Sequence, residues 1–337
     1  MNSSRYFLLL FIECNKINTK LEEIIVTIAT ILSLGETALK LGLICSLTVL
    51  ALFLSYSMLN VCDLSTDGCF TLGAAVGAAG GSQRTLPFYQ IFAAMAAGIC
   101  SGFVTAILQT KLGVDSLLAG IIVNTALYSV NIAVMGGSSL INMNRTETVF
   151  SMMKETLKST PLKGRGDIVV AFIAVAIVIV FLVFFLRTRL GLAIRATGNN
   201  ADMVKSSSIN PVFTTIVGLC VANSFTALSG CLLSQSQKSV DINIGQGMVT
   251  IALASLLIGG TILGRGGIFR ESCWHGTLDL FYFPSGIYRC TEIQYAGIYA
   301  EKKLVSSVIV VLAISGPYLK KQWPQIKRRM THRKGVQ

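Results

Sequence analysis

The amino-acid sequence predicts an all-α, polytopic integral membrane helical bundle with broken or re-entrant segments, and three observations support this prediction. The chain of 337 residues is 53% hydrophobic, and its mean hydropathy is +0.67. Charged residues make up only 13% of it, about half the share expected of a soluble domain. They are absent from six long windows, which are 41–62, 85–110, 116–144, 168–186, 206–237 and 242–264.

These charge-free windows are long enough to cross a bilayer. A helix needs roughly 20 apolar residues to span the hydrocarbon core, and a soluble helix would carry charges along its outer face at 3.6-residue spacing. A membrane β-barrel would instead show alternating segments of about ten residues. The runs in this chain are continuous and rich in Leu, Ile, Val, Ala and Gly, so they favour helices.

The net charge of +12 is concentrated beside the apolar runs. Arg187, Arg189 and Arg195 follow the run 168–186. A second cluster follows the last apolar run and consists of Lys320, Lys321, Lys327, Arg328, Arg329, Arg333 and Lys334. Loops and tails on the cytoplasmic side of membrane spans carry such an excess of basic residues. The charge therefore indicates topology, with a basic cytoplasmic tail at 320–337, rather than binding of nucleic acid.

Signatures of enzymes and of metal sites are missing from the sequence. It has two histidines, His275 and His332, and nine scattered cysteines without a CxxC pair. This excludes a standard zinc site and a disulfide framework. Because there is no GxxxxGK[ST] phosphate loop, the chain is not expected to hydrolyse ATP itself. We therefore predict no catalytic residue, no metal and no cofactor bound by this chain.

The apolar runs divide the chain into an N-terminal segment at 1–36, a transmembrane domain at 37–319 and the basic tail. The predicted spans are 37–59, 86–109, 113–135, 168–186, 211–235, 247–263 and 304–319. Residues 136–167 form one sizeable soluble loop, and the basic loop 187–210 is expected in the cytoplasm. Because a single span separates these two loops, 136–167 is expected outside.

A polar break separates the first span from a run of small residues. Asn60, Asp63 and Asp67 lie in the break, and the run 69–81 is crowded with Gly and Ala, which let helices approach closely in lipid. The run is too short to cross alone, so it predicts a half-helix or re-entrant segment buried by its neighbours. Carboxylates near membrane depth are rare and usually functional. The two aspartates either cap a half-helix that begins near Phe70 or line a translocation path.

Four motifs occur in an order that resembles bacterial ATP-binding-cassette (ABC) importer permeases. They are LNVCDLSTDG at 59–68 with FTLGAAV at 70–76, GLAIRATGNN at 191–200 with SINP at 208–211, IGG at 258–260 with GRGG at 264–267, and YLK at 318–320. The resemblance covers roughly 37–270 and 304–323. Within the branched-chain amino acid and ribose permease branch, the chain is similar most of all to permeases of the tryptophan/tyrosine type.

The resemblance implies a membrane-spanning permease subunit of a bacterial plasma membrane, with about eight to ten transmembrane or half-membrane helices and a cytoplasmic C-terminus. Such a subunit moves a small polar solute, by resemblance an amino acid, inward by alternating access. ATP acts through a separate ATP-binding subunit. The other expected partners are an extracytoplasmic substrate-binding protein, a second copy of the permease and the lipid bilayer.

The resemblance also implies that the loop 187–210 contains a short coupling helix that docks into a groove of the ATPase subunit. The expected coupling residues are Gly191, Arg195, Ala196, Gly198, Asn199 and Asn200. The two glycines would punctuate the helix, the asparagines would suit its end, and Arg195 would bind carbonyls or carboxylates of the partner. Charge alone would favour a solvated, positive-inside loop instead.

Two further asparagines are candidates for the translocation path. Asn124 and Asn131 lie seven residues apart in a charge-free span and therefore share a helix face. Interhelical hydrogen bonding explains such residues in a membrane, and it is expected also of Asn223, which lies inside another span. Lining of the pathway is the alternative. The predicted pathway residues are Asn60, Asp63, Asp67, Asn124 and Asn131.

The stretch 271–303 departs from the resemblance. If 247–263 crosses the membrane, topology requires another crossing before the cytoplasmic tail, but 271–303 carries charges whose burial at mid-bilayer costs at least about 2.5 kcal/mol each. Either 247–263 is re-entrant or 271–303 is not what the fold expects. A local frameshift that ends near Lys303 explains the abrupt loss of membrane character, and a genuine but unusual loop is the alternative.

The residues leave rival functions open. An ion-coupled secondary transporter also uses broken helices and polar residues at the midplane, but it should carry carboxylates deep in its spans, and the long windows hold none. A non-transporting membrane scaffold would not need the small-residue run or a coupling helix. If 271–303 is frameshifted, the product is an impaired permease.

Overall fold

The computed structural model describes residues 30, 33, 35–37, 39–82, 86–144, 146–156 and 166–263, and most of them are helical. The first helix ends in a π-helical turn, η1 (Phe53–Met58). The elements that follow are α2 (Thr66–Ser82), α3 (Pro87–Thr110), α4 (Ser116–Val134), β1 (Leu140–Asn142), α5 (Val149–Thr156), α6 (Gly166–Arg187), α7 (Arg189–Asn199), α8 (Ala201–Ser206), α9 (Pro211–Gln237), β2 (Ser239–Asp241) and α10 (Met248–Leu263).

Five helices within these residues are long and apolar enough to cross a membrane. They are the first helix (Gly35–Met58), α3, α4, α6 and α9. Each matches a predicted span, which confirms the all-α membrane bundle. α2 and α10 are shorter, with 17 and 16 residues. The predicted span 304–319, the tail 320–337 and the stretch 271–303 lie outside the described residues.

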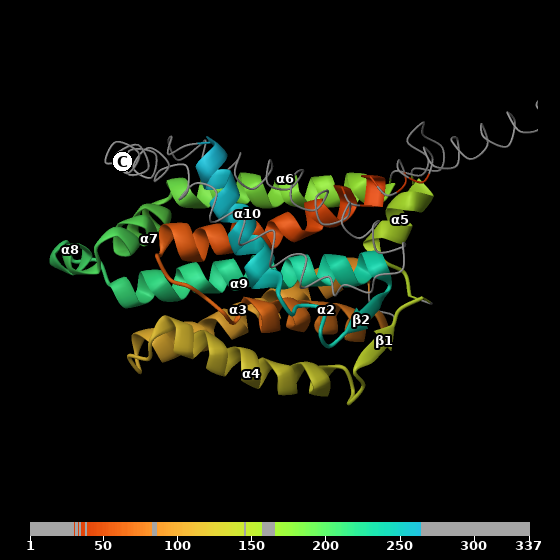
Figure 1. Ribbon diagram of the computed structural model, residues 1–337, viewed down its shortest axis with the longest axis horizontal. Coiled ribbons are helices and arrows are strands. Elements are labelled where there is room, and N and C mark those ends of the chain that lie inside the picture. Colours follow the sequence, from red (N-terminus) through yellow and green to blue (C-terminus); the bar gives the residue numbers. More distant parts are fainter. Residues whose placement is uncertain are drawn as a thin grey trace, which may run out of the picture.

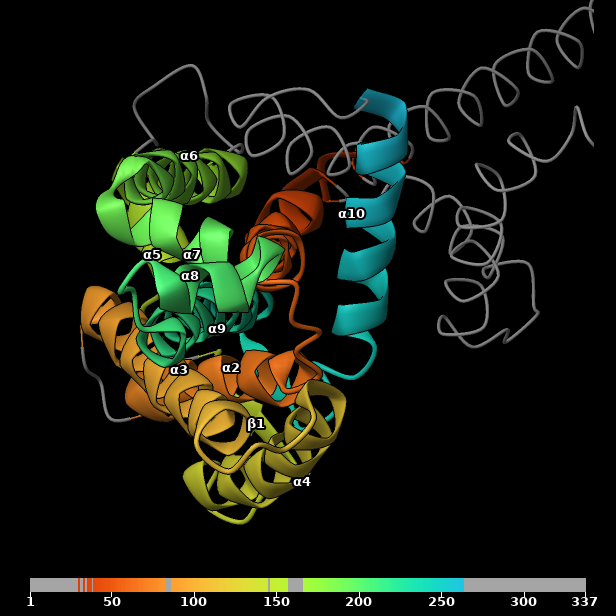
Figure 2. The same cartoon turned by 90° about the vertical axis from the view of Figure 1, so that its left-hand side faces the viewer.

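α9 is the central helix of the bundle, with α2 and α3 packed on one side of it and the first helix and α6 on the other (Figures 1 and 2). Glycines make these contacts close. A Cβ added to Gly73 of α2 would collide with the backbone of Ala227, and one added to Gly230 of α9 would collide with the backbone of Phe70. Small residues allow such approach between helices in lipid, as the run 69–81 predicts.

The bundle has two different ends (Figure 1). α7 and α8 lie at one end, next to the last residues of α6 and the first residues of α9. β1, β2 and α5 lie at the other end. The two strands pair antiparallel, with Leu140 opposite Asp241 and Asn142 opposite Ser239. The predicted soluble loop 136–167 therefore contains a strand and a short helix, and the strand ties it to the segment after α9.

The first span and α2 are joined by irregular backbone inside the bundle. Residues 59–65 run from the end of η1, beside α7, back to the start of α2 (Figure 1). The Sγ of Cys69 lies 3.3 Å from the carbonyl oxygen of Asn223, so α2 starts near the middle of α9. Such backbone is tolerated at membrane depth only where protein buries it. α2 is therefore a half-helix, but it begins at Thr66 rather than near Phe70.

Candidate functional site

Asp63 lies in a buried polar cluster between α2 and α9. It is 2% exposed. Its Oδ2 accepts a hydrogen bond of 3.0 Å from Nδ2 of Asn223, and its Oδ1 accepts one of 2.8 Å from the backbone N–H of Ser65. Among the residues that the structure describes, Asp63 forms no ion pair, whereas Asp167 and Asp202 do. This carboxylate near mid-membrane is therefore held by neutral donors at the start of a helix, where the helix dipole also favours it.

Asp67, in the first turn of α2, caps a different helix. Its Oδ2 accepts a hydrogen bond of 3.0 Å from the N–H of Gly247, and its Oδ1 accepts one of 2.8 Å from the N–H of Val249. These amides stand at the start of α10, where a helix leaves its donors unpaired. The sequence predicts that the two aspartates either cap α2 or line the translocation path. Asp63 accepts from the amide of Ser65, directly before α2, whereas Asp67 caps α10 instead and ties α2 to it.

Asn124 and Asn131 both face the start of α2. Asn131 is 1% exposed, and its Nδ2 donates a hydrogen bond of 3.2 Å to the carbonyl oxygen of Gly68. Its Oδ1 is buried without a hydrogen-bond partner among the described residues. A Cβ added to Gly68 would lie 2.6 Å from Oδ1 of Asn124, so glycine is needed for α4 to approach. Asn131 therefore makes the interhelical hydrogen bond that was predicted for these asparagines.

Asn60 reverses the chain between η1 and α2. Its φ of +56° is in the left-handed region, which Asn adopts more readily than most residues. The N–H of Leu59 donates to the carbonyl of Leu54 at 3.2 Å, which closes the π-helical turn just before it. Asn60 is exposed, whereas Asp63 is buried. The structure therefore separates Asn60 from the polar cluster that contains the other pathway candidates.

α7 rests on two elements of the bundle. The hydroxyl groups of Thr197 and Thr214 lie 2.8 Å apart and link α7 to the start of α9. Gly198 touches the backbone of Met58, the last residue of η1, so closely that any Cβ would collide with it. Gly191 is also buried against backbone, at the end of α6. Both glycines lie inside α7, so the prediction that they punctuate the helix is wrong; they allow it to pack closely.

The opposite face of α7 points away from the bundle. It holds Leu192, Arg195 and Asn199, which share a face because they are spaced three and four residues apart. Leu192 is 55% exposed, Asn199 is exposed and Arg195 is half-buried. This face combines a leucine with a charged and an amide side chain, and the described neighbours of α7 in the bundle do not cover it.

Asn200 separates α7 from α8, as its predicted place at a helix end requires. Its N–H donates to the carbonyl of Ala196 at 3.0 Å and ends α7. Its Oδ1 accepts hydrogen bonds of 3.1 Å from the N–H groups of Asp202 and Met203 and begins α8. Ala196 itself is half-buried. The predicted coupling loop is therefore two helices joined at one asparagine.

The predicted residues form two sites, and two participants were missed. The polar cluster brings together Asp63, Asn131 and the start of α2, and the coupling candidates lie at the α7 end. The missed residues are Met58 and Leu192, whereas Asn223 makes the interhelical hydrogen bond expected of it. The spacing of Leu192 from Arg195 was a usable signal, but the contact of Met58 joins segments far apart in sequence. Within the described ranges, no group of three His, Cys, Asp or Glu could hold a metal ion.

Comparison with known proteins gives consistent matches. The family described as branched-chain amino acid transport system / permease component matches residues 34–270. A tyrosine transport system permease protein of Clostridioides difficile is 30% identical over 80% of this chain and 86% of its own length. The ribose import permease protein RbsC of Escherichia coli K12 is 25% identical over 75% of each chain. No solved structure gives a significant match.

Proposed function

Because the chain belongs to the branched-chain amino acid transport system permease family, we propose that it carries an amino acid inward by alternating access. It is a multi-pass membrane protein and the permease component of an ABC importer, a transport subunit rather than an enzyme. The family implies a separate ATPase subunit and a substrate-binding protein as partners. Permease motion is then a rigid-body change between two arrangements of helices.

The observation that carries the proposal is the position of α7. Its outer face, Leu192 with Arg195 and Asn199, is available to an ATPase subunit. Its inner face contacts η1 through Gly198 and α9 through Thr197. The residues after η1 lead directly to the buried carboxylate of Asp63. A movement of α7 driven by ATP therefore reaches the broken span through backbone contact, without a long chain of intervening side chains.

The distribution of charge supports an orientation with α7 in the cytoplasm. Among the described residues, the α7 end carries five basic and two acidic side chains, which are Lys111, Arg187, Arg189, Arg195, Lys205, Asp115 and Asp202. Basic residues are enriched on the cytoplasmic side of membrane spans. The proposed orientation therefore puts α7 and α8 at the cytoplasmic face of a bacterial plasma membrane.

An amino acid is the proposed substrate, and an aromatic one is the first to test. Support comes from the tyrosine permease, which is more similar than the ribose permease and is matched over more of its length. Asp63, Asp67, Asn124 and Asn131 supply the polar groups near mid-membrane. A homodimer of the chain with a pathway between its copies completes the proposal.

The buried carboxylate of Asp63 is a feature that favours an ion-coupled secondary transporter. Such transporters use broken helices and carboxylates near the midplane. The hydrogen bonds of Asp63 to Ser65 and Asn223 give it a structural purpose in the folded chain, and membership of the permease family favours the ATP-driven importer.

Co-purification tests the proposal. The chain is extracted from native membranes in mild detergent, and the bound proteins are identified and quantified. We expect a nucleotide-binding subunit at equal stoichiometry, and its loss in Arg195→Glu because the reversed charge repels the carboxylates or carbonyls that Arg195 binds. Lys111→Glu is the matched control: it makes the same charge change at the same end, but on an exposed turn outside α7 and α8.

Three outcomes would contradict parts of this proposal. A well-folded chain without any nucleotide-binding partner would favour the ion-coupled transporter. Loss of the partner in both variants would assign binding to general positive charge rather than to α7. Retention of the partner in both would remove Arg195 from the docking surface.

A further inference from the structure

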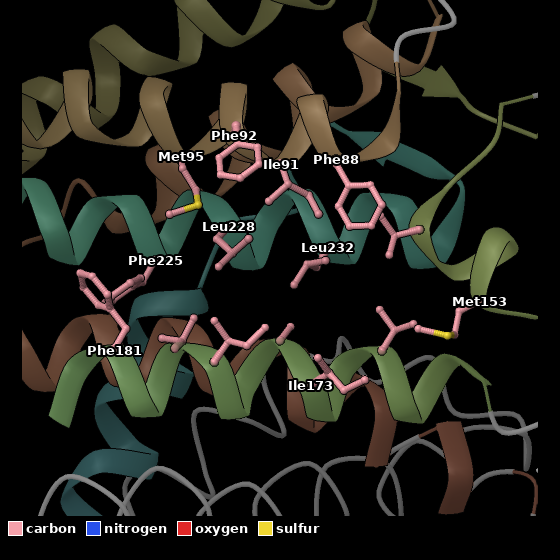
Figure 3. A pocket seen from close by; sticks show the side chains of 15 residues that line it. Phe88, Ile91, Phe92, Met95, Met153, Ile173, Phe181, Phe225, Leu228 and Leu232 are labelled. Atoms are coloured by element: carbon pink, nitrogen blue, oxygen red, sulfur yellow. The ribbon is translucent and has the colours of Figure 1, made fainter. Parts of the chain in front are cut away.

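A groove runs between α6 on one side and α3 and α9 on the other, with α5 at one end (Figure 3). Its cavity volume is about 410 Å³. Every one of its lining side chains is apolar. Its floor is formed by α9 residues such as Leu228 and Leu232, which are 7% and 2% exposed. This groove takes no part in the polar cluster or in the α7 surface described above.

The groove is open along its rim. Phe92 of α3 and Ile173 of α6 lie on opposite sides of it and are 69% and 43% exposed (Figure 3). The same side chains belong to the outer surfaces of two membrane-spanning helices. The groove is therefore continuous with the surface by which α3 and α6 meet the bilayer, and its opening lies at hydrocarbon depth.

Water is a poor occupant of this space, because an ordered water needs two to four polar partners and the walls offer none. An empty groove would forfeit dispersion contacts along all of its walls. A dry apolar cavity of about 150 Å³ is enough to bind benzene, so this groove has room for a substantially longer hydrocarbon. Lipid chains are the hydrocarbon that surrounds a membrane-spanning chain.

The α5 end of the groove marks where a lipid headgroup would lie. Met153 of α5 and Val170 of α6 line this end. Their neighbours are Lys154 and Asp167, whose charged groups are 3.0 Å apart. Charged side chains are stable at the membrane interface and costly at the midplane. A chain lying in the groove therefore enters from the leaflet on the α5 side, opposite to α7 and α8.

We propose that this groove binds one acyl chain of a phospholipid from the leaflet on the α5 side, as a retained component of the folded protein. The bound chain fills the space between α6 and the α3–α9 pair and contacts the floor residues of α9. This inference is independent of the transported substrate and of the ATPase partner.

Native mass spectrometry tests the proposal. The full chain is reconstituted in vesicles of palmitoyl-oleoyl phosphatidylethanolamine and phosphatidylglycerol, extracted in mild detergent and weighed intact. One phospholipid per chain is expected to stay bound. Ala174→Phe places a ring in the groove and is expected to reduce the lipid-bound fraction at least tenfold. Val180→Phe adds a ring to α6 outside the groove, where Val180 is 68% exposed, and is expected to leave that fraction unchanged.

Thermal unfolding separates loss of lipid from loss of fold. Added phospholipid is expected to raise the unfolding temperature of the wild type and of Val180→Phe, and to leave that of a folded Ala174→Phe chain unchanged. Ala174→Leu, which fills less of the groove, serves if Ala174→Phe does not fold, and an intermediate loss of lipid is expected. A wild type that retains no phospholipid would overturn the proposal and indicate that another part of the chain or a second copy fills the groove. Equal retention in the groove and control variants would overturn it as well.

Discussion

At the scale of single residues, the two aspartates of the polar break show how similar side chains acquire different partners. Asp63 precedes α2 and accepts from Ser65 and Asn223, so it holds the break against the central helix. Asp67 lies one turn later, and its side chain reaches the start of α10. Buried polar groups at membrane depth must find partners within the protein. Both carboxylates meet this requirement with neutral amide donors.

Removal of the Asp67 carboxylate is expected to loosen α10. Loss of an N-cap costs about 0.5–2 kcal/mol, so Asp67→Ala should accelerate amide hydrogen exchange at 247–251 by about 2- to 30-fold. Hydrogen-exchange mass spectrometry of the detergent-purified chain measures this. Asp115→Ala is the control, because Asp115 caps α4 through the N–H of Leu117 at 2.9 Å and should affect the start of α4 only. Unchanged exchange at 247–251 in Asp67→Ala would contradict the capping role.

At the scale of elements, the π-helical turn η1 and α7 are in close contact. A π-helical turn contains one more residue in its hydrogen-bonded ring than an α-helical turn, and such turns are frequent at functional sites. η1 sits where the first span ends and the irregular segment 59–65 begins. α7 packs on its last residue through Gly198. α7 thus contacts the first span at the residue where the helix of that span ends and the irregular segment begins.

A methyl group at Gly198 is expected to uncouple transport. Because a Cβ would collide with the backbone of Met58, Gly198→Ala must displace α7 from η1, at a cost of about 1–3 kcal/mol for overpacking. Uptake of radiolabelled substrate into proteoliposomes that contain the whole importer should fall at least tenfold. Gly35→Ala is the same substitution at a position with nothing within 4 Å and should leave uptake unchanged. Normal uptake by Gly198→Ala would show that the close contact is dispensable.

At the scale of the whole molecule, the two ends of the bundle differ in structure. One end carries α7 and α8 with the basic residues of the loop 187–210, and the other carries α5 and the β1–β2 pair. The central helix α9 connects the two ends, and α2 and α3 lie against it. This polarity assigns opposite sides of the membrane to the α7 surface and to the strand pair.

Thiol labelling is expected to report that polarity. In a chain whose nine cysteines are replaced by alanine, Met203→Cys should react with a membrane-impermeant maleimide only in inside-out vesicles. Leu140→Cys should react only in intact cells with a permeable outer envelope. Both side chains are well exposed, at 67% and 58%, so burial does not prevent their reaction. Labelling of both from the same side would contradict the proposed orientation.

Resequencing of the encoding DNA tests the frameshift hypothesis for 271–303. The family match ends at residue 270, immediately before the stretch in which charged residues become frequent. We expect a pair of compensating insertions or deletions at its two borders, and correction of the frame should restore an apolar span. A clean read without such changes would establish the stretch as a genuine part of this chain.

The sequence by itself determined that the chain crosses a membrane, where its main spans begin and end, and that 69–81 belongs to a half-helix or re-entrant segment. Those conclusions depend on local composition, because a span must be apolar over its whole length. Only the tertiary structure decided that Asp67 caps α10, that Asp63 binds Asn223 and that Gly198 contacts Met58. Each of these contacts joins residues far apart along the chain, and local patterns carry no information about which distant segment a side chain will meet. The groove between α3, α6 and α9 could not be predicted for the same reason. A continuous apolar run does not indicate which face of the helix contacts protein and which face contacts lipid.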